Sequence, residues 1–71
     1  MFYVYVLQSE RDAGLYIGYT NNLKHRLRQH NLGESKATSS RCPLRLIYHE
    51  AYTIREDAQG RERFLKSGAG R

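Results

Sequence analysis

The sequence has few of the features that mark exported, disulfide-linked or membrane-bound proteins. Its single cysteine, Cys42, excludes an internal disulfide and a structural zinc site of the usual multi-cysteine kind, and it fits a reducing, cytoplasmic setting. The apolar run at 1–7 is too short for a signal peptide or a membrane span, and no basic segment precedes it. No internal repeat, low-complexity run or linker divides the 71 residues, so we expect one domain over residues 1–71.

Acidic residues are also scarce relative to basic ones. The chain has 12 Lys and Arg against 7 Asp and Glu, a formal net charge of +5 and a pI near 9.7. Such a field attracts polyanions, and nucleic acid is the leading candidate partner. Positive charge that only keeps a small protein soluble explains the composition equally well, so local motifs must decide.

Two runs rich in aromatic and β-branched residues predict strands at Phe2–Leu7 and Leu15–Thr20. The polar connection between them has hairpin length and ends in Gly14, so the strands should pair antiparallel. Side chains on paired strands share a face only when they lie opposite each other or an even number of residues apart. Whether Tyr5 and Tyr16 share a face depends on a register that the sequence leaves open.

A helix is expected next, capped by Asn21 or Asn22 and ending near Gly33. Its inward stripe is formed by the residues at helical spacing, Leu23, Leu27 and His30. Arg26 lies one turn from both ends of this stripe, so Arg26 and His30 border it. The positions expected to face outward are Lys24, His25, Arg28 and Gln29.

The segment Glu34–Cys42 is polar and rich in serine and threonine, which predicts a loop over the surface. Hydroxyls and cations in such a loop are candidate phosphate contacts, and here they are Lys36, Thr38, Ser39, Ser40 and Arg41. A solvated connection without a ligand is the more frequent role of a loop of this composition.

The segment Leu44–Tyr52 is again strand-like, with apolar or aromatic residues on both faces. One expected face carries Leu44, Leu46, Tyr48 and Tyr52, and the other carries Ile47 and Ala51. This two-sided pattern predicts a central strand. Thr53 and Glu56 then match the capping-box pattern, which predicts a second helix from about Ile54 to Ser67.

On this second helix, the apolar residues Ile54, Ala58 and Leu65 form the expected inward stripe. Helical geometry places Glu62 on the same stripe, one turn from Ala58. An ionised carboxylate is rarely buried without a partner. One explanation is structural, an ion pair of Glu62 with Lys66 at the favourable i,i+4 spacing. The other is a hard divalent cation at the edge of a cleft, with waters and a phosphate oxygen completing its coordination.

Three further residues have both a structural and a functional explanation. Arg26 either covers apolar surface or pairs with Glu62, or it stabilises the charge that builds up on a pentacovalent phosphorus. A lone histidine such as His30 is usually a satisfied structural residue. Most buried tyrosines are core residues, although a neighbouring cation would allow Tyr16 to relay a proton from water.

Taken in order along the chain, these motifs resemble the GIY-YIG nuclease family. The residues that carry the resemblance are Tyr3-Val4-Tyr5, Tyr16-Ile17-Gly18, Arg26, His30, Glu62 and Lys66. The small stand-alone bacterial members are the most similar, and these look like the N-terminal nuclease domain of the excinuclease C subunit and the catalytic domain of some homing endonucleases. The resemblance extends from Tyr3 to about Gly70 and implies an α+β fold, a small three-stranded antiparallel sheet flanked by helices.

The resemblance also implies a chemistry. A single Mg²⁺ or Mn²⁺ would be held by Glu62, and the substrate would be DNA, with branched or damaged DNA among the candidates. Tyr16 would be the general base or a hydroxyl that orients water, and Tyr5 a supporting hydroxyl. Arg26 would bind the phosphate, and His30 would be a second candidate for the base.

The chain departs from the family pattern at a few positions. Tyr3 stands where the family name has glycine, and Tyr19 stands where the excinuclease type has a lysine. Gly18 is retained, and by the resemblance it keeps the strand backbone unobstructed near the site. The sequence ends soon after Lys66, so we expect a further helix and its polar residue to be absent and the domain to be truncated there.

The sequence therefore predicts a metal-dependent endonuclease that hydrolyses phosphodiester bonds in DNA. The residues expected to contact the nucleic acid are Lys24, Arg28, Lys36, Thr38, Arg41 and Lys66. Two alternatives remain: a non-catalytic nucleic-acid-binding module on the same scaffold, and a domain with a degenerate site that binds a protein partner.

Overall fold

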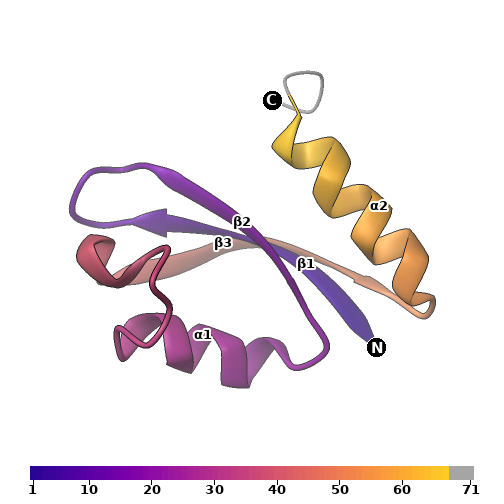
Figure 1. Cartoon of the computed structure of the whole chain (residues 1–71), viewed down its shortest axis with the longest axis horizontal. Helices are drawn as coiled ribbons and strands as arrows, with labels where there is room; N and C mark the ends of the chain where they lie inside the picture. The colour runs from indigo at the N-terminus through magenta and orange to yellow at the C-terminus, as the bar shows by residue number, and fades with distance from the viewer. Residues whose placement is uncertain (68–71) are drawn as a thin grey trace.

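The computed structural model describes residues 1–67 and consists of a three-stranded sheet, two α-helices and a short 3₁₀ helix (Figure 1). In chain order the elements are β1 (Phe2–Ser9), β2 (Leu15–Thr20), α1 (Leu23–Asn31), η1 (Ser39–Arg41), β3 (Leu44–Tyr52) and α2 (Arg55–Lys66). The predicted α+β class is confirmed. Within the described residues, neither helix combines the length and the apolar character that crossing a bilayer requires. Expectations for 68–71 lie outside the described residues.

The central strand of the sheet is β1, which pairs antiparallel with β2 on one side and with β3 on the other. The prediction that Leu44–Tyr52 is a central strand is therefore wrong, because β3 lies at an edge. Apolar residues on both faces of a strand indicate that both faces of the sheet are covered. They do not indicate how many neighbouring strands it has.

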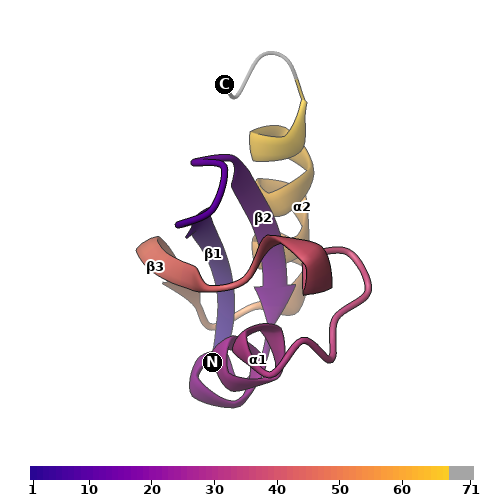
Figure 2. The same ribbon diagram turned by 90° about the vertical axis from the view of Figure 1, so that its left-hand side faces the viewer.

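The two helices lie on opposite faces of the sheet (Figures 1 and 2). One face carries the core cluster of Tyr5, Leu7 and Leu44, against which Leu23, Leu27 and Leu46 pack. Because Leu23 and Leu27 belong to α1, this helix covers that face. On the other face, Ala58 of α2 is completely buried and the guanidinium of Arg55 lies 5.4 Å from the ring centre of Phe2.

A β-bulge interrupts the pairing of β1 with β3. Val6 pairs with Tyr48 and Leu7 pairs with Leu46, so Ile47 is an extra residue on β3. The bulge reverses the alternation of side chains beyond it. Leu44 and Leu46 therefore lie on the face of Leu7, whereas Tyr48 and Tyr52 lie on the opposite face. The prediction that all four residues lie on one face of the sheet is therefore wrong.

The start of α2 also differs from the prediction. The helix begins at Arg55, and Ile54 occupies the N-cap position without a side-chain cap, so the predicted capping box does not form. Ile54 is 51% exposed and does not belong to the buried stripe. The acidic residues Glu56 and Asp57 in the first turn stabilise the helix instead through its dipole.

An ion pair holds α2 against β3. Arg61 donates to both carboxylate oxygens of Glu50 at 2.9 and 3.2 Å, and the hydroxyls of Tyr48 and Tyr52 donate to the same carboxylate at 2.6 and 2.7 Å. These hydrogen bonds, with that of Arg61 the largest effect, lower the pKa of Glu50 to about 2.

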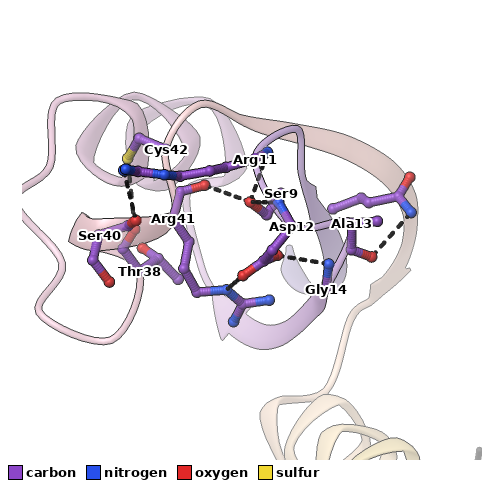
Figure 3. Close-up of polar contacts among 10 residues, drawn as sticks. Ser9, Arg11, Asp12, Ala13, Gly14, Thr38, Ser40, Arg41 and Cys42 are labelled. Atoms are coloured by element: carbon purple, nitrogen blue, oxygen red, sulfur yellow. Dashed lines mark hydrogen bonds and ion pairs between the residues drawn. The ribbon is translucent and has the colours of Figure 1, made fainter.

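The segment between α1 and β3, predicted as a surface loop, contains a helical turn and buried side chains. It contains η1, and Ser35 and Thr38 are buried. Polar contacts connect it to the β1–β2 hairpin (Figure 3). The hydroxyl of Ser9 donates to the carbonyl of Arg41 at 2.7 Å, and the side chain of Arg41 pairs with Asp12 at 3.4 Å. The hairpin and this segment therefore form one packed unit.

Candidate active site

The register of the hairpin brings Tyr5 and Tyr16 onto one face of the sheet. Tyr5 pairs with Gly18 and Leu7 pairs with Tyr16, so the two tyrosines are diagonal neighbours separated by an even offset. Their ring centres are 6.4 Å apart. Because Tyr5 is 1% exposed and Tyr16 is only half-buried, Tyr16 is the phenol that solvent or a substrate can reach.

Gly18 makes this arrangement possible. A Cβ atom at Gly18 would overlap the Oη and Cζ atoms of Tyr5. The ring of Tyr5 therefore lies across β2 directly over the glycine, in space that any larger residue would fill. The implied role of Gly18, an unobstructed strand backbone, has a definite geometric basis here.

His30 lies at the centre of the cluster. Its Nε2 is 3.0 Å from the hydroxyl of Tyr5, and its ring centre is 5.0 Å from that of Tyr16. The side chain is 0% exposed, which agrees with the predicted place of His30 on the inward stripe of the helix. Burial, followed by the charge of Arg26, lowers the pKa of His30, and the imidazole is therefore neutral at pH 7.

Arg26 adds a positive charge to the cluster. The nearby phenol of Tyr5 is the main reason that the pKa of Arg26 is raised, and the phenol of Tyr16 adds to the effect. The arginine side chain is half-buried, and its Nη1 donates to Oε1 of Gln29 at 3.1 Å. A guanidinium held beside hydroxyl groups is suited to binding a phosphate.

The local sequence explains why α1 can present these residues. Asn22 caps the helix by accepting a hydrogen bond from the amide of His25 at 3.1 Å, and Gly33 follows the helix with φ of +76°. Both features agree with the prediction. The helix therefore begins directly after β2, so Arg26 and His30 are held over the tyrosines of the hairpin.

Glu62 lies on α2, which covers the opposite face of the sheet from α1. Its side chain is 21% exposed, and Oε2 is ion-paired with Nζ of Lys66 at 2.8 Å. Burial is the main cause of the raised pKa of Tyr5, and the negative charge of Glu62 adds to it. The carboxylate therefore lies within electrostatic reach of Tyr5. Both explanations of Glu62 that the sequence left open remain compatible with its position.

A single carboxylate limits which metal the site suits. Within residues 1–67, no group of three or more His, Cys, Asp and Glu side chains is arranged to hold an ion. Zinc and calcium sites need several protein ligands. Magnesium is commonly held by one or two carboxylates together with waters and substrate phosphates. The residues present are compatible with such a single-carboxylate site at Glu62 and leave the metal itself a hypothesis.

The residues predicted to bind nucleic acid are in different environments. Lys24, Arg28 and Lys36 are exposed, whereas Arg41 is paired with Asp12 and Lys66 with Glu62. Thr38 is 0% exposed, and its hydroxyl is 2.7 Å from Nδ1 of His30. The structure contradicts the predicted phosphate contact of Thr38, because its side chain points inward.

Two contacts of His30 were not predicted from the sequence. Thr38, expected to contact phosphate, contacts Nδ1 of His30 instead, and Sγ of Cys42 donates to the carbonyl of His30 at 3.0 Å. Both lie in a polar segment whose composition is typical of a surface loop. Only the packing of this segment under α1 reveals their positions.

The structure thus gathers two tyrosines, an arginine and a buried histidine on one face of the small sheet of an α+β domain. Over residues 1–71 the chain matches the family model for the GIY-YIG catalytic domain. The chain belongs to the GIY-YIG family, a nuclease family, as its motifs predicted.

Within this family the chain is similar to the small UPF0213 proteins. It is 43% identical over 67 residues to a UPF0213 protein of Clostridium perfringens, covering 93% of this chain and 71% of the relative. It is 41% identical over 66 residues to a UPF0213 protein of Haloquadratum walsbyi, covering 92% of this chain and 73% of the relative. The solution NMR structure of a UPF0213 protein from Bacillus halodurans matches with a TM-score of 0.57 and 35% identity, covering 93% of this chain and 71% of that one.

Proposed function

We propose that this protein is a divalent-metal-dependent endonuclease that hydrolyses phosphodiester bonds in DNA. The observation that carries the proposal is the cluster of Tyr5, Tyr16, Arg26 and His30 in a chain of a nuclease family. The cluster combines a cation for the phosphate with hydroxyl groups that can orient a water molecule.

Arg26 binds the phosphate and stabilises the additional negative charge that develops on it in the transition state. Tyr16, which is partly exposed, orients the attacking water and relays its proton to bulk solvent: the phenol oxygen takes the proton of the water as its own proton passes to solvent. His30 is completely buried and its Nε2 contacts Tyr5, so it acts on the water only through the hydroxyl of Tyr5.

Glu62 is the residue that would hold the proposed Mg²⁺ or Mn²⁺, and waters and phosphate oxygens would complete the coordination. When bound, such an ion supplies Lewis-acid stabilisation of the phosphate. Lys66 must then release the carboxylate, and this costs little, because a surface i,i+4 pair contributes about 0.2–0.5 kcal/mol. The exposed cations Lys24, Arg28 and Lys36 are the proposed contacts to the DNA backbone.

A nicking assay on supercoiled and branched DNA with Mg²⁺ or Mn²⁺ tests the proposal. Glu62→Ala and Arg26→Ala should each lower the cleavage rate by about 100-fold or more, since each removes a group that stabilises charge in the transition state. Glu56→Ala is the matched control, because Glu56 is an exposed acid on the same helix as Glu62. Cleavage by Glu62→Ala at the wild-type rate would overturn the metal assignment.

The Glu62–Lys66 ion pair at 2.8 Å favours a second candidate, a nucleic-acid-binding module without catalysis. A carboxylate that is permanently neutralised by a lysine would hold no cation. Gel-shift measurements on the same variants distinguish the two functions. If the protein is only a binding module, the wild type and both variants should all bind DNA, and none of the three should cleave it with either metal ion.

A further inference from the structure

A chain of hydrogen bonds runs from Tyr5 through His30 to Thr38. The hydroxyl of Tyr5 is 3.0 Å from Nε2 of His30, and Nδ1 of His30 is 2.7 Å from the hydroxyl of Thr38. All three side chains are 0–1% exposed. Water therefore does not compete for these groups, and each nitrogen of the imidazole has one defined partner.

The direction of these hydrogen bonds follows from the donors that are present. The oxygen of Tyr5 lies beside the guanidinium of Arg26, and a guanidinium can only donate. Since Tyr5 is buried, its own proton needs an acceptor, and the acceptor within hydrogen-bonding distance is Nε2 of His30. A neutral imidazole carries one proton, which must then reside on Nδ1 and be donated to the oxygen of Thr38.

The segment after α1 is built to hold Thr38 in this position. The amide of Thr38 donates to the carbonyl of Ser35 at 3.1 Å, and its carbonyl accepts from the amide of Arg41 at 2.9 Å. Sγ of Cys42 lies 3.0 Å from the carbonyl of His30 and 3.6 Å from that of Thr38. The thiol therefore connects the backbone of the helix to that of the segment that carries the threonine, close to the hairpin contacts of Figure 3.

We propose that Thr38 is a positioning residue that holds His30 in the tautomer protonated on Nδ1, so that Nε2 remains the acceptor for the proton of Tyr5. With that proton directed to His30, the lone pairs of the Tyr5 oxygen are free to accept from the neighbouring guanidinium of Arg26. The effect on cleavage rests on the proposed nuclease function, whereas the tautomer is a property of the folded protein alone.

The test combines two substitutions that separate the hydroxyl of Thr38 from its shape. Thr38→Val keeps the branched shape and removes the hydroxyl, and Thr38→Ser keeps the hydroxyl and removes the methyl group. Long-range ¹H–¹⁵N NMR spectra of the full chain report which nitrogen of His30 carries the proton. The exposed side chains of His25 and His49 serve as internal references in the same spectra.

Wild type and Thr38→Ser should both show an unprotonated Nε2 and a protonated Nδ1 on His30. In Thr38→Val the buried Nδ1–H loses its acceptor, so the population with the proton on Nε2 should increase. Nicking should slow by about 10- to 100-fold in Thr38→Val, as for other residues that orient a reactive imidazole. Thr38→Ser should restore most of the rate, and DNA affinity should be unchanged in both variants.

Each outcome decides one of the two claims. A wild-type His30 protonated on Nε2, or a Thr38→Val protein with the wild-type tautomer, overturns the proposal. The expected tautomer shift in a protein that never cleaves DNA supports the role of Thr38 and overturns the nuclease function instead. If Thr38→Val does not fold, Thr38→Ala replaces it with the same expected shift, since it also lacks the hydroxyl.

Discussion

Replacing Gly18 with alanine tests how strictly the site depends on the packing of one tyrosine. The added Cβ would overlap Oη and Cζ of Tyr5 and come within 2.9 Å of Cε2. The backbone at Gly18 cannot shift easily because it is paired with Tyr5 in the sheet, and the ring of Tyr5 cannot shift easily because it is only 1% exposed. The ring must therefore leave its position and lose its contact with His30.

The expected cost has two parts. Overpacking a well-packed core costs about 1–3 kcal/mol. Leaving a buried hydrogen-bonding group without its partner costs about 1–3 kcal/mol more, and here this group is Nε2 of His30. The free energy of unfolding of Gly18→Ala should thus fall by at least about 2 kcal/mol. For a chain of this size, that lowers Tm by about 8 °C or more.

Urea unfolding followed by circular dichroism measures this loss, and Gly60→Ala is the matched control. Gly60 lies within α2, and the nearest atom to an added Cβ is Nη2 of Arg63 at 3.9 Å. The control should therefore gain about 0.5–1 kcal/mol from the better helix propensity of alanine. If Gly18→Ala is as stable as the wild type, Tyr5 does not occupy the space over Gly18 and the geometry of the cluster is wrong.

Three further predictions concern the helix cap, the ion pair and the metal. Asn22→Ala should lower the free energy of unfolding by about 1 kcal/mol in urea titrations, because it removes the N-cap of α1. The pKa of Glu50 is lowered from 4.5 to about 2, so its stabilisation is complete above pH 4.5 and is lost as the pH falls toward 2. The full shift corresponds to at most about 3 kcal/mol. Solvent screening of the partly exposed Arg61 reduces this to about 1–2 kcal/mol. If the carboxylate is responsible, the free energy of unfolding of Glu50→Gln should fall less steeply than that of the wild type between pH 5 and 3. Lys66→Ala should tighten Mn²⁺ binding by roughly 2-fold, measured by paramagnetic broadening near Glu62, whereas weaker binding would argue against the metal site.

Much of the secondary structure could be predicted because the patterns that decide it are local. Aromatic and β-branched runs predicted β1 and β2, and the bounds of β2 agree with the prediction. Asn22 and Gly33 were recognised as the ends of α1 for the same reason. The capping box at Thr53 failed although its pattern was present, because Ile54 occupies the cap position and the helix begins one residue later.

The apolar residues on both faces of β3 show that a local sequence pattern does not predict the position of a strand within the sheet. The apolar pattern correctly predicted that Leu44 is buried, whereas Ile47 and Tyr48 are exposed. The position of β3 at the edge of the sheet depends on which other strands pair with it. The bulge at Ile47 also comes from the pairing with β1, where two residues of one strand oppose one of the other. Neither property is carried by the segment itself.

The sequence alone determined the chemical groups of the candidate site and its first half, since Tyr16, Gly18 and Arg26 lie within one short strand–helix stretch. The tertiary structure decided which of these groups meet. A register offset of two residues placed Tyr5 beside Tyr16, and the packing of the segment after α1 buried His30 against Thr38. These contacts join residues far apart in the chain, and their energies depend on burial and geometry that no local pattern of residue types contains.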